Sequence, residues 1–496
     1  MPSRSRSRTP SSGSSRRVTC CSHCLSFLSS GEQWTYHHLY VFLLTFFSYA
    51  LLHASRKTLS TVKGSLIETW THNNTLFVDI PSAESFLALL DGGFLGAYAV
   101  GLYVSGFLGD RYSPSKVLGI GMFFSAVMVF LFGTVTEWMH FYSKIFYMVT
   151  WIGGGFIQSL GWPTEVCIMG NWFGHKTHGA VLGLWSSCAS VGNVIGTMIA
   201  SRAIIYGYEY AFGINAALLL LGSFIILLCL NSTPQQVGLT NPNESEQYGS
   251  IADDDIRRPE PISFCRAWLL PGVLSYSLAY ACLKMVNYSF FFWLPFYLHN
   301  HYNWNESLAD GLSIWYDLGG IVAAVIAGVL SDKYNSRTPI VVLMLTVAMG
   351  TIFAYAKSPK DILINSLLMT VTGFFIGGPA NLVSAAISAD LGKAEEIRGS
   401  AEALSTVSGI IDGTGSIGAS VGQILLPVVQ NAFGWDYVFY SFIVMILMSV
   451  ICLIPLTIRE IRCRRKFNYS ILPADESIAD TIDATQPEAS TSYNAI

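Results

Sequence analysis

The sequence predicts an all-α membrane protein with twelve transmembrane helices. Its 496 residues are 52% hydrophobic and only 12% charged, whereas ordinary soluble domains carry about 25% charged residues. The apolar composition continues from residue 39 to residue 458, and the mean hydropathy of the chain is +0.46. A bilayer core requires roughly 20 apolar residues per helix, and twelve segments of the chain meet that requirement.

The twelve segments are read as helices because barrel strands would alternate apolar and polar residues over about ten positions. The first segment follows a polar leader that has no small-residue cleavage site, so we do not expect a removable signal peptide. In chain order, the expected spans are residues 39–60, 86–108, 117–135, 145–169, 180–200, 211–230, 268–298, 312–330, 339–356, 362–388, 401–430 and 437–458.

The loop charges predict the orientation of these spans. Of the 28 Lys and Arg residues, 20 fall in the tails and in the loops on one side, five fall in the opposite loops, and three fall inside spans. Because cytoplasmic loops carry the excess of Lys and Arg, both termini are expected to be cytosolic. The expected organisation is a cytosolic N-tail, a first half of six helices, a polar cytosolic central loop, a second half of six helices and a cytosolic C-tail, at residues 1–38, 39–230, 231–265, 266–458 and 459–496.

Several functional classes are excluded by composition and motifs. The net charge is −4 and no basic stripe is present, which argues against a nucleic-acid partner. No hydrolase, kinase or nucleotide-binding motif occurs, and His175 and His178 do not form a metal-ligand set. We therefore expect neither an enzyme nor a cofactor or metal.

Two short motifs recur in corresponding places of the two halves. The run Gly106-Phe-Leu-Gly-Asp110-Arg111 follows the second span, and Gly328-Val-Leu-Ser-Asp332-Lys333 follows the eighth, 222 residues later. Gly-Trp-Pro ending at Pro163 and Gly-Gly-Pro ending at Pro379 are 216 residues apart. The alternative, two ordinary turns with surface ion pairs, does not explain why the match follows the repeat.

The first of these motifs resembles the signature loop of the major facilitator superfamily. The resemblance implies two six-helix repeats with a substrate site between the halves, near the middle of the membrane. It also implies that the aspartates, Asp110 and Asp332, pair with basic residues at a helix end and hold one conformation. The predicted conformational latch is Asp110, Arg111, Asp332 and Lys333.

Three cations fall where lipid would otherwise be, and ionisable groups inside spans usually face a polar cavity. Arg56 and Lys57 lie in the first span, and Ser60 shares a helical face with Arg56. Lys284 lies in the seventh span among Tyr280, Asn287 and Tyr288. A guanidinium group suits a phosphate dianion through paired hydrogen bonds, and an ammonium group adds a point charge. The alternative for Arg56 and Lys57 is that their side chains reach the membrane surface from the end of a short apolar run.

Acidic residues in the spans are fewer, and their roles stay open. Any of them could couple protons, although most are expected to pair with a basic neighbour or to cap a helix. They are Asp91, Glu165, Asp317, Asp390, Glu402 and Asp412.

A closer family resemblance rests on five runs of sequence: residues 51–58, 161–174, 183–188, 280–295 and 369–379. Over about residues 36–460 the chain resembles the organophosphate:phosphate antiporters, and within them the sugar-phosphate exchangers of solute carrier family 37. The resemblance implies exchange of a phosphorylated sugar, or of a related organophosphate or phosphonate anion, for inorganic phosphate by alternating access. Arg56 would bind phosphate with Lys57 beside it, and Trp185 matches the family motif of the fifth span.

The chain also departs from the family pattern. Ser186, Ala189 and Ser190 replace the Asn, His and Asn of that fifth-span motif, and Asn287 stands at the usual basic position of the seventh span. These departures argue against efficient exchange of glucose 6-phosphate itself. They leave open a carrier of another organic anion, or a scaffold that keeps the fold without transporting.

Sequons and tail motifs suggest an endomembrane protein. Asn73 and Asn305 are the sequons in expected lumenal loops and are therefore the candidate glycosylation sites. Tyr-x-x-bulky motifs in the cytosolic segments favour the lysosome over simple residence in the endoplasmic reticulum. The substrate, the coupling ion and an accessory membrane subunit are not determined by the sequence.

Overall fold

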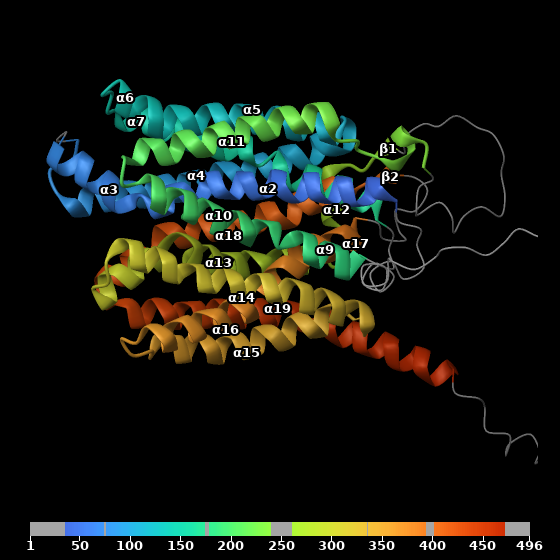
Figure 1. Cartoon of the computed structure of the whole chain (residues 1–496). Coiled ribbons are helices and arrows are strands. Elements are labelled where there is room, and N and C mark those ends of the chain that lie inside the picture. The colour runs from blue at the N-terminus through green and yellow to red at the C-terminus, as the bar shows by residue number, and fades with distance from the viewer. Residues whose placement is uncertain are drawn as a thin grey trace, which may run out of the picture.

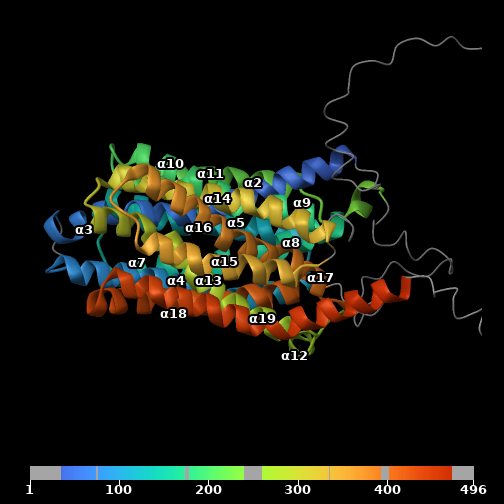
Figure 2. The ribbon, with the colours of Figure 1, turned by 90° about the horizontal axis from the view of Figure 1, so that it is seen from below.

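The computed structural model describes residues 35–73, 76–173, 178–239, 260–334, 336–392 and 401–471. The helices run side by side and form one elongated bundle (Figure 1). Helix α2 begins and helix α19 ends at the same end of this bundle, and Figure 2 shows the same arrangement from below. We call this end, where α12 also lies, the α12 end, and the opposite end, where α3 lies, the α3 end.

The first half extends from α2 to η4. Several of its membrane passages are divided into consecutive helical pieces, because π-helical turns and short breaks interrupt them. Its elements are α2 (Tyr36–Thr61), α3 (Lys63–Glu68), η1 (Thr69–Asn73), α4 (Ile80–Arg111), α5 (Pro114–Val129), η2 (Phe130–Val135), α6 (Thr136–Trp138), α7 (Lys144–Gln158), α8 (Gly161–Trp172), α9 (His178–Ser186), α10 (Cys188–Ala203), α11 (Tyr208–Cys229) and η4 (Pro234–Val237).

The second half extends from α12 to α19. A two-residue parallel strand pair, which the sequence analysis did not predict, joins the segment before α12 to the segment before α18. The elements are β1 (Glu260–Pro261), α12 (Phe264–Trp268), α13 (Val273–Tyr302), α14 (Glu306–Lys333), α15 (Thr338–Ala356), α16 (Ile362–Asn381), η5 (Leu382–Ile387), α17 (Ser388–Leu391), β2 (Ala401–Glu402), α18 (Leu404–Phe433) and α19 (Trp435–Ile471).

Each of the twelve predicted spans has a helical counterpart. Within the described ranges, nine helical segments are long and apolar enough to cross a membrane. The other three passages, α7 with α8, α13 and α18, are less apolar, and they carry Gln158, Lys284 and Asp412. Each of these three passages thus brings a polar side chain to the centre of the bundle.

The seventh span begins later than the sequence predicts. We expected it to start at residue 268, but α13 starts at Val273, and Phe264–Trp268 forms the separate helix α12. Gly272 separates the two helices with a φ of +95°, a left-handed conformation that residues with a side chain rarely adopt.

Glycines bring the two halves close together toward the α12 end. A methyl group at Gly409 of α18 would lie 2.6 Å from the carbonyl oxygen of Leu102 in α4. Likewise, a methyl group at Gly183 of α9 would lie 2.6 Å from the carbonyl oxygen of Ala324 in α14. Small residues at such crossings allow helix backbones to approach closely in membranes.

Candidate substrate-binding site

A central cavity lies between the two halves. Both halves line it, with aromatic rings and with polar side chains, the two kinds of group that small-molecule sites combine. The lining residues are Tyr49, His53, Lys57, Trp162, Ala189, Ser190, Asn193, Tyr280, Asn287, Tyr288, Phe290, Phe291, Leu294, Ser313, Tyr316, Asp317, Gly320, Gly377, Ala380, Asn381, Ser384 and Asp412.

Arg56 is fully buried beside this cavity. Its Nε and Nη2 each donate to the side-chain oxygen of Gln158 at 3.3 Å, and its Nη1 donates to the hydroxyl of Tyr288 at 3.2 Å. Its Cζ lies 4.6 Å from the ring centre of Tyr98 and 5.2 Å from that of Phe94. All these partners are neutral, and Arg56 forms no ion pair within the described ranges. A buried guanidinium without a carboxylate partner is available to an anion.

The orientation of Gln158 follows from its own contacts. Its amide nitrogen donates to the hydroxyl of Ser55 at 3.4 Å, which leaves its oxygen directed at Arg56. Ser55 and Arg56 are consecutive on α2, and Gln158 is the last residue of α7. Two helices of the first half therefore position the guanidinium group together.

Lys57 lines the cavity and reaches across to the second half. Its Nζ donates to the carbonyl oxygen of Phe291 in α13 at 2.6 Å, and Ser60 donates to the same oxygen at 3.3 Å. That carbonyl would normally accept from the backbone N–H four residues later, but residue 295 is proline, which has no N–H. The proline thus frees a carbonyl in the membrane, and the predicted site residues Lys57 and Ser60 satisfy it.

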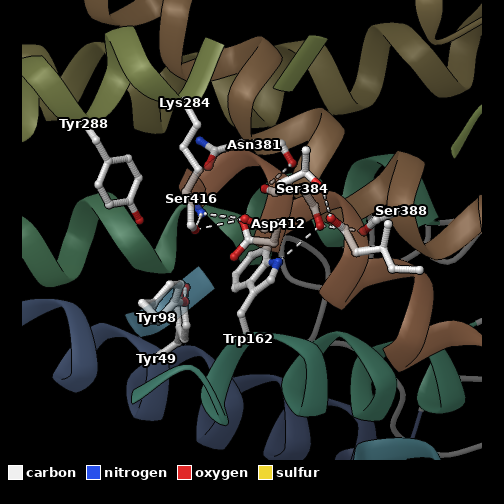
Figure 3. Close-up of polar contacts among 12 residues, drawn as sticks. Tyr49, Tyr98, Trp162, Lys284, Tyr288, Asn381, Ser384, Ser388, Asp412 and Ser416 are labelled. Atoms are coloured by element: carbon white, nitrogen blue, oxygen red, sulfur yellow. Dashed lines mark hydrogen bonds and ion pairs between the residues drawn. The ribbon is translucent and has the colours of Figure 1, made fainter. Parts of the chain in front are cut away.

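The third predicted cation, Lys284, has an internal partner. Its Nζ lies 2.7 Å from Oδ1 of Asp412 and donates to the hydroxyl of Ser416 at 2.8 Å, both from α18. The pair is buried, with 2% and 5% of the two side chains exposed. Figure 3 shows Lys284, Asp412 and Ser416 together, with Tyr49, Tyr98 and Trp162 of the first half facing them. The positive charge of Lys284 is therefore compensated before any ligand arrives.

The neutral residues predicted for the site differ in position. Tyr280 and Asn287 line the cavity, and Asn287 accepts a hydrogen bond from Tyr316 at 2.8 Å. Trp185 is completely buried behind the lining and stacks on Trp162 at 5.1 Å between ring centres. Trp185 therefore reaches the cavity only through Trp162.

Trp162 connects the two halves. Its Nε1 donates to the backbone oxygen of Ser384 in η5 at 3.2 Å (Figure 3). The aromatic pair of Trp162 and Trp185 is held on its other side by Thr45, which accepts from Trp185 at 3.0 Å.

Three of the six acidic residues pair with bases, as expected of them. Asp91 pairs with Lys63 and Asp390 with Arg337, each at 2.5 Å, in addition to the Asp412 pair. Glu165 instead accepts from Ser48 at 2.6 Å, and Asp317 accepts from Asn193 at 2.8 Å. The side chain of Glu402 lies outside the described residues.

The predicted latch is partly visible. The side chain of Asp110 lies outside the described residues, and Arg111 is the last residue of α4. In the second half, Asp332 lies 3.5 Å from Arg337, which also pairs with Asp390, while Lys333 ends α14 with its side chain exposed. The base that pairs with Asp332 here is therefore Arg337, four residues after the predicted Lys333.

The two candidate glycosylation sites lie at the α3 end. The side chain of Asn73 lies outside the described residues, at the end of η1. Asn305 is exposed and caps α14, where its side-chain oxygen accepts from the backbone N–H of Leu308 at 2.7 Å.

Two residues around the cavity were missed by sequence reasoning. Gln158 and Asn193 are neutral polar residues inside spans, and the search for charged residues did not weigh them. The rule that polar groups in membranes face cavities or partners applies to neutral groups as well, so a search for Gln and Asn in the spans would have found Gln158 and Asn193.

Comparison with known proteins gives consistent matches along the chain. A family model of the Major Facilitator Superfamily matches residues 45–401. Sugar phosphate exchanger 3 of Xenopus laevis is 50% identical over 473 residues, which are 87% of this chain and 94% of that relative. The human protein of the same name is 49% identical over 467 residues, covering 87% and 94%. An Arabidopsis thaliana protein, named as a candidate glycerol-3-phosphate transporter, is 36% identical over 445 residues, covering 85% and 87%.

A solved structure with a similar fold is the proton:xylose symporter XylE bound to 6-bromo-6-deoxy-D-glucose. Its TM-score is 0.63, and the match covers 85% of this chain and 96% of that one. At 14% identity, this likeness concerns the fold alone.

Proposed function

The chain belongs to the major facilitator superfamily and, within it, to the branch of the sugar phosphate exchangers, and on that premise we propose that it exchanges phosphorylated sugars or related organophosphate anions for inorganic phosphate. The prediction of a twelve-helix fold of two halves is confirmed, as is the resemblance read from its motifs. The protein is a multi-pass membrane transporter, and its curated relatives carry the names of transporters and exchangers.

Arg56 is the observation that carries the proposal. A guanidinium fork matches the geometry of a phosphate group and donates two hydrogen bonds to it. Its present acceptors, Gln158 and Tyr288, are neutral, so a phosphate can replace them without breaking an ion pair. Lys57, the next residue on α2, lines the cavity and adds a second positive charge.

Alternating access would use contacts that join the halves at each end. Toward the α3 end, Lys57 and Ser60 bind the carbonyl of Phe291. Toward the α12 end, Trp162 binds the backbone of Ser384. The proposal is that substrate binding at Arg56 allows one set of contacts to open while the other holds.

We place the protein in an endomembrane, in the endoplasmic reticulum or the lysosome, with both termini in the cytosol. The surplus of Lys and Arg on one side supports this orientation, and so does the position of the start of α2 and the end of α19 at one end of the bundle (Figure 1). Phosphate as the counter-substrate and an accessory membrane subunit are part of the same proposal.

Reconstituted exchange tests the proposal. Proteoliposomes loaded with phosphate should take up labelled inorganic phosphate and glycerol 3-phosphate, and uptake should need internal phosphate. Arg56→Ala should reduce this exchange by about 100-fold or more, because the site loses two hydrogen bonds to a charged group. Arg56→Lys should recover only part of the loss, because an ammonium group lacks the planar fork.

Arg266→Ala is the matched control, since Arg266 is exposed on α12, away from the cavity. It should exchange phosphate at the wild-type rate. Wild-type protein that shows no phosphate-dependent uptake, or Arg56→Ala protein that is as active as Arg266→Ala, would refute the proposal. Uptake of another organic anion that phosphate does not inhibit would favour the alternative carrier.

A further inference from the structure

Asp317 is a carboxylate in the wall of a cavity assigned to anions, and that contradiction calls for a physical explanation. It lies on α14 in the second half, facing residues of the first half. Within the described ranges, no basic side chain forms an ion pair with it. Lys57, a cation that also lines the cavity, donates to the carbonyl of Phe291 instead.

A chain of hydrogen bonds connects Asp317 to the first half. Asn193 of α10 donates from its amide nitrogen to Oδ1 of Asp317 at 2.8 Å. The amide oxygen of Asn193 lies 3.0 Å from Nδ1 of His53 in α2. Because an ionised carboxylate only accepts hydrogen bonds, the amide must donate to Asp317, and its oxygen is left to accept from the ring N–H of His53. Three helices from both halves thus fix the carboxylate in one orientation.

The carboxylate keeps acceptor capacity toward the cavity. An ionised carboxylate offers about four acceptor positions, and Asn193 uses one of them. Asp317, Asn193 and His53 all line the cavity, together with the hydroxyl-bearing Ser190 and Ser313. Hydrogen-bond donors are therefore the groups that this wall can bind, and alcohol hydroxyls are donors of that kind.

The position of these hydrogen-bonded residues orients such a ligand. His53 and Arg56 lie on α2, three residues and therefore about 4.5 Å apart along the helix. From His53 the hydrogen bonds lead away from α2, through Asn193, to Asp317 on the other half. Like charges repel, so a phosphate group is disfavoured near Asp317 and favoured near Arg56 and Lys57.

We propose that Asp317, held by Asn193 and His53, is a hydroxyl-binding subsite that selects polyol phosphates and orients them with the phosphate toward Arg56. The subsite rests on the proposed function, because it specifies which organophosphates the same cavity takes. It binds vicinal hydroxyl groups through the carboxylate oxygens, and it gives no such contact to a phosphate ester that lacks hydroxyls.

Three probes in phosphate-loaded proteoliposomes test the subsite: inorganic phosphate, glycerol 3-phosphate and methyl phosphate. Wild-type protein should prefer glycerol 3-phosphate to methyl phosphate by about tenfold or more, since a hydrogen bond to a charged group has an effect of that order. Asp317→Asn should remove most of this preference while phosphate self-exchange continues. Asp436→Asn is the matched control, because Asp436 is an exposed carboxylate of the same half, outside the cavity, and it should keep the wild-type preference.

The alternative role for Asp317 is structural, as polar packing between α10 and α14. In that case Asp317→Asn would reduce the exchange of all three probes equally, and this result would overturn the subsite. If the wild-type protein shows no phosphate self-exchange, the proposed function is refuted instead.

A second measurement covers the case in which Asp317→Asn does not fold. Thermal unfolding of the purified wild-type protein should shift upward more with glycerol 3-phosphate than with methyl phosphate at equal concentration, since the tighter ligand stabilises more. Equal shifts would overturn the subsite without any variant.

Discussion

Arg56 in the first half and Lys284 in the second half are both buried cations beside the central cavity, but they differ in their partners. Among the described residues, Arg56 donates to two neutral groups only, Gln158 and Tyr288. Lys284 lies against Asp412 at 2.7 Å and donates to Ser416. A carboxylate already compensates the charge of Lys284, whereas Arg56 has no such partner in the part of the chain that the structure describes and is the cation proposed to bind an anion. The comparison teaches that the halves repeat the position of a cation without repeating its role.

The largest expected effect comes from removing Lys284. Lys284→Met leaves Asp412 buried and unpaired, which should cost about 3–5 kcal/mol of stability. Arg56→Met leaves no carboxylate behind, so its loss of stability should be clearly smaller. Thermal unfolding of both variants in detergent measures the difference.

The double variant Lys284→Met with Asp412→Leu is the control for this prediction. It should recover most of the stability lost in Lys284→Met, because replacing both members of a buried pair removes the unpaired charge. Equal losses in the two single variants would show that Arg56 and Lys284 do not differ as described.

An intermediate effect is expected at Pro295. This residue decides whether Lys57 is available to an anion, as Arg56 is, or is held by an internal partner, as Lys284 is. Pro295→Ala gives α13 an N–H that can bind the carbonyl of Phe291, so Lys57 should be released from it. Phosphate should then bind more tightly, by about 2–10-fold, the effect of one ordinary hydrogen bond. Competition for phosphate exchange in proteoliposomes measures this affinity.

Pro455→Ala provides the comparison, because Pro455 is an exposed proline inside α19. It should leave phosphate affinity unchanged. Weaker binding in Pro295→Ala would mean that the contact with Phe291 holds Lys57 where the substrate needs it.

The smallest effect on transport is expected at the sequons, one in each half. Asn73→Gln and Asn305→Gln should each remove one glycan and increase gel mobility, with exchange near the wild-type rate. Asn305→Gln should also cost about 1 kcal/mol or less, because Asn305 caps α14. Gel mobility with and without deglycosylation is the readout. Asn243 is a sequon in the central loop, which is expected to be cytosolic. A double variant that does not shift, alongside a shift from Asn243→Gln, would reverse the predicted orientation.

Hydropathy predicted the fold well because a membrane requires each passage to be an apolar helix. Hydropathy indicated a membrane passage least clearly for α7 with α8, for α13 and for α18. These passages supply Gln158, Lys284 and Asp412. The start of α13 could not be placed from composition, since the boundary depends on the left-handed backbone of Gly272 and the residues on both sides are apolar.

The sequence predicted which charges enter the membrane but not how they are compensated. Lys284 and Asp412 are 128 residues apart, and only the packing of α13 against α18 brings them together. Lys63 of α3 is buried against Asp91 of α4 for the same reason. The contact of Lys57 with Phe291 could not be predicted from the sequence pattern. It depends on the backbone carbonyl of Phe291, which Pro295 leaves without its partner in the helix.

The uncompensated charge of Arg56 has a consequence for energy coupling. When the empty carrier passes through a closed form, the charge of Arg56 has to stay buried without a counter-ion. When the carrier is loaded, the bound anion neutralises that charge. The bound anion then acts as the counter-ion of Arg56. The conformational change that returns the empty carrier to its starting side would therefore be slow unless another anion binds. If Arg56 binds the anion as proposed, its unpaired charge would itself favour one-for-one exchange over leakage.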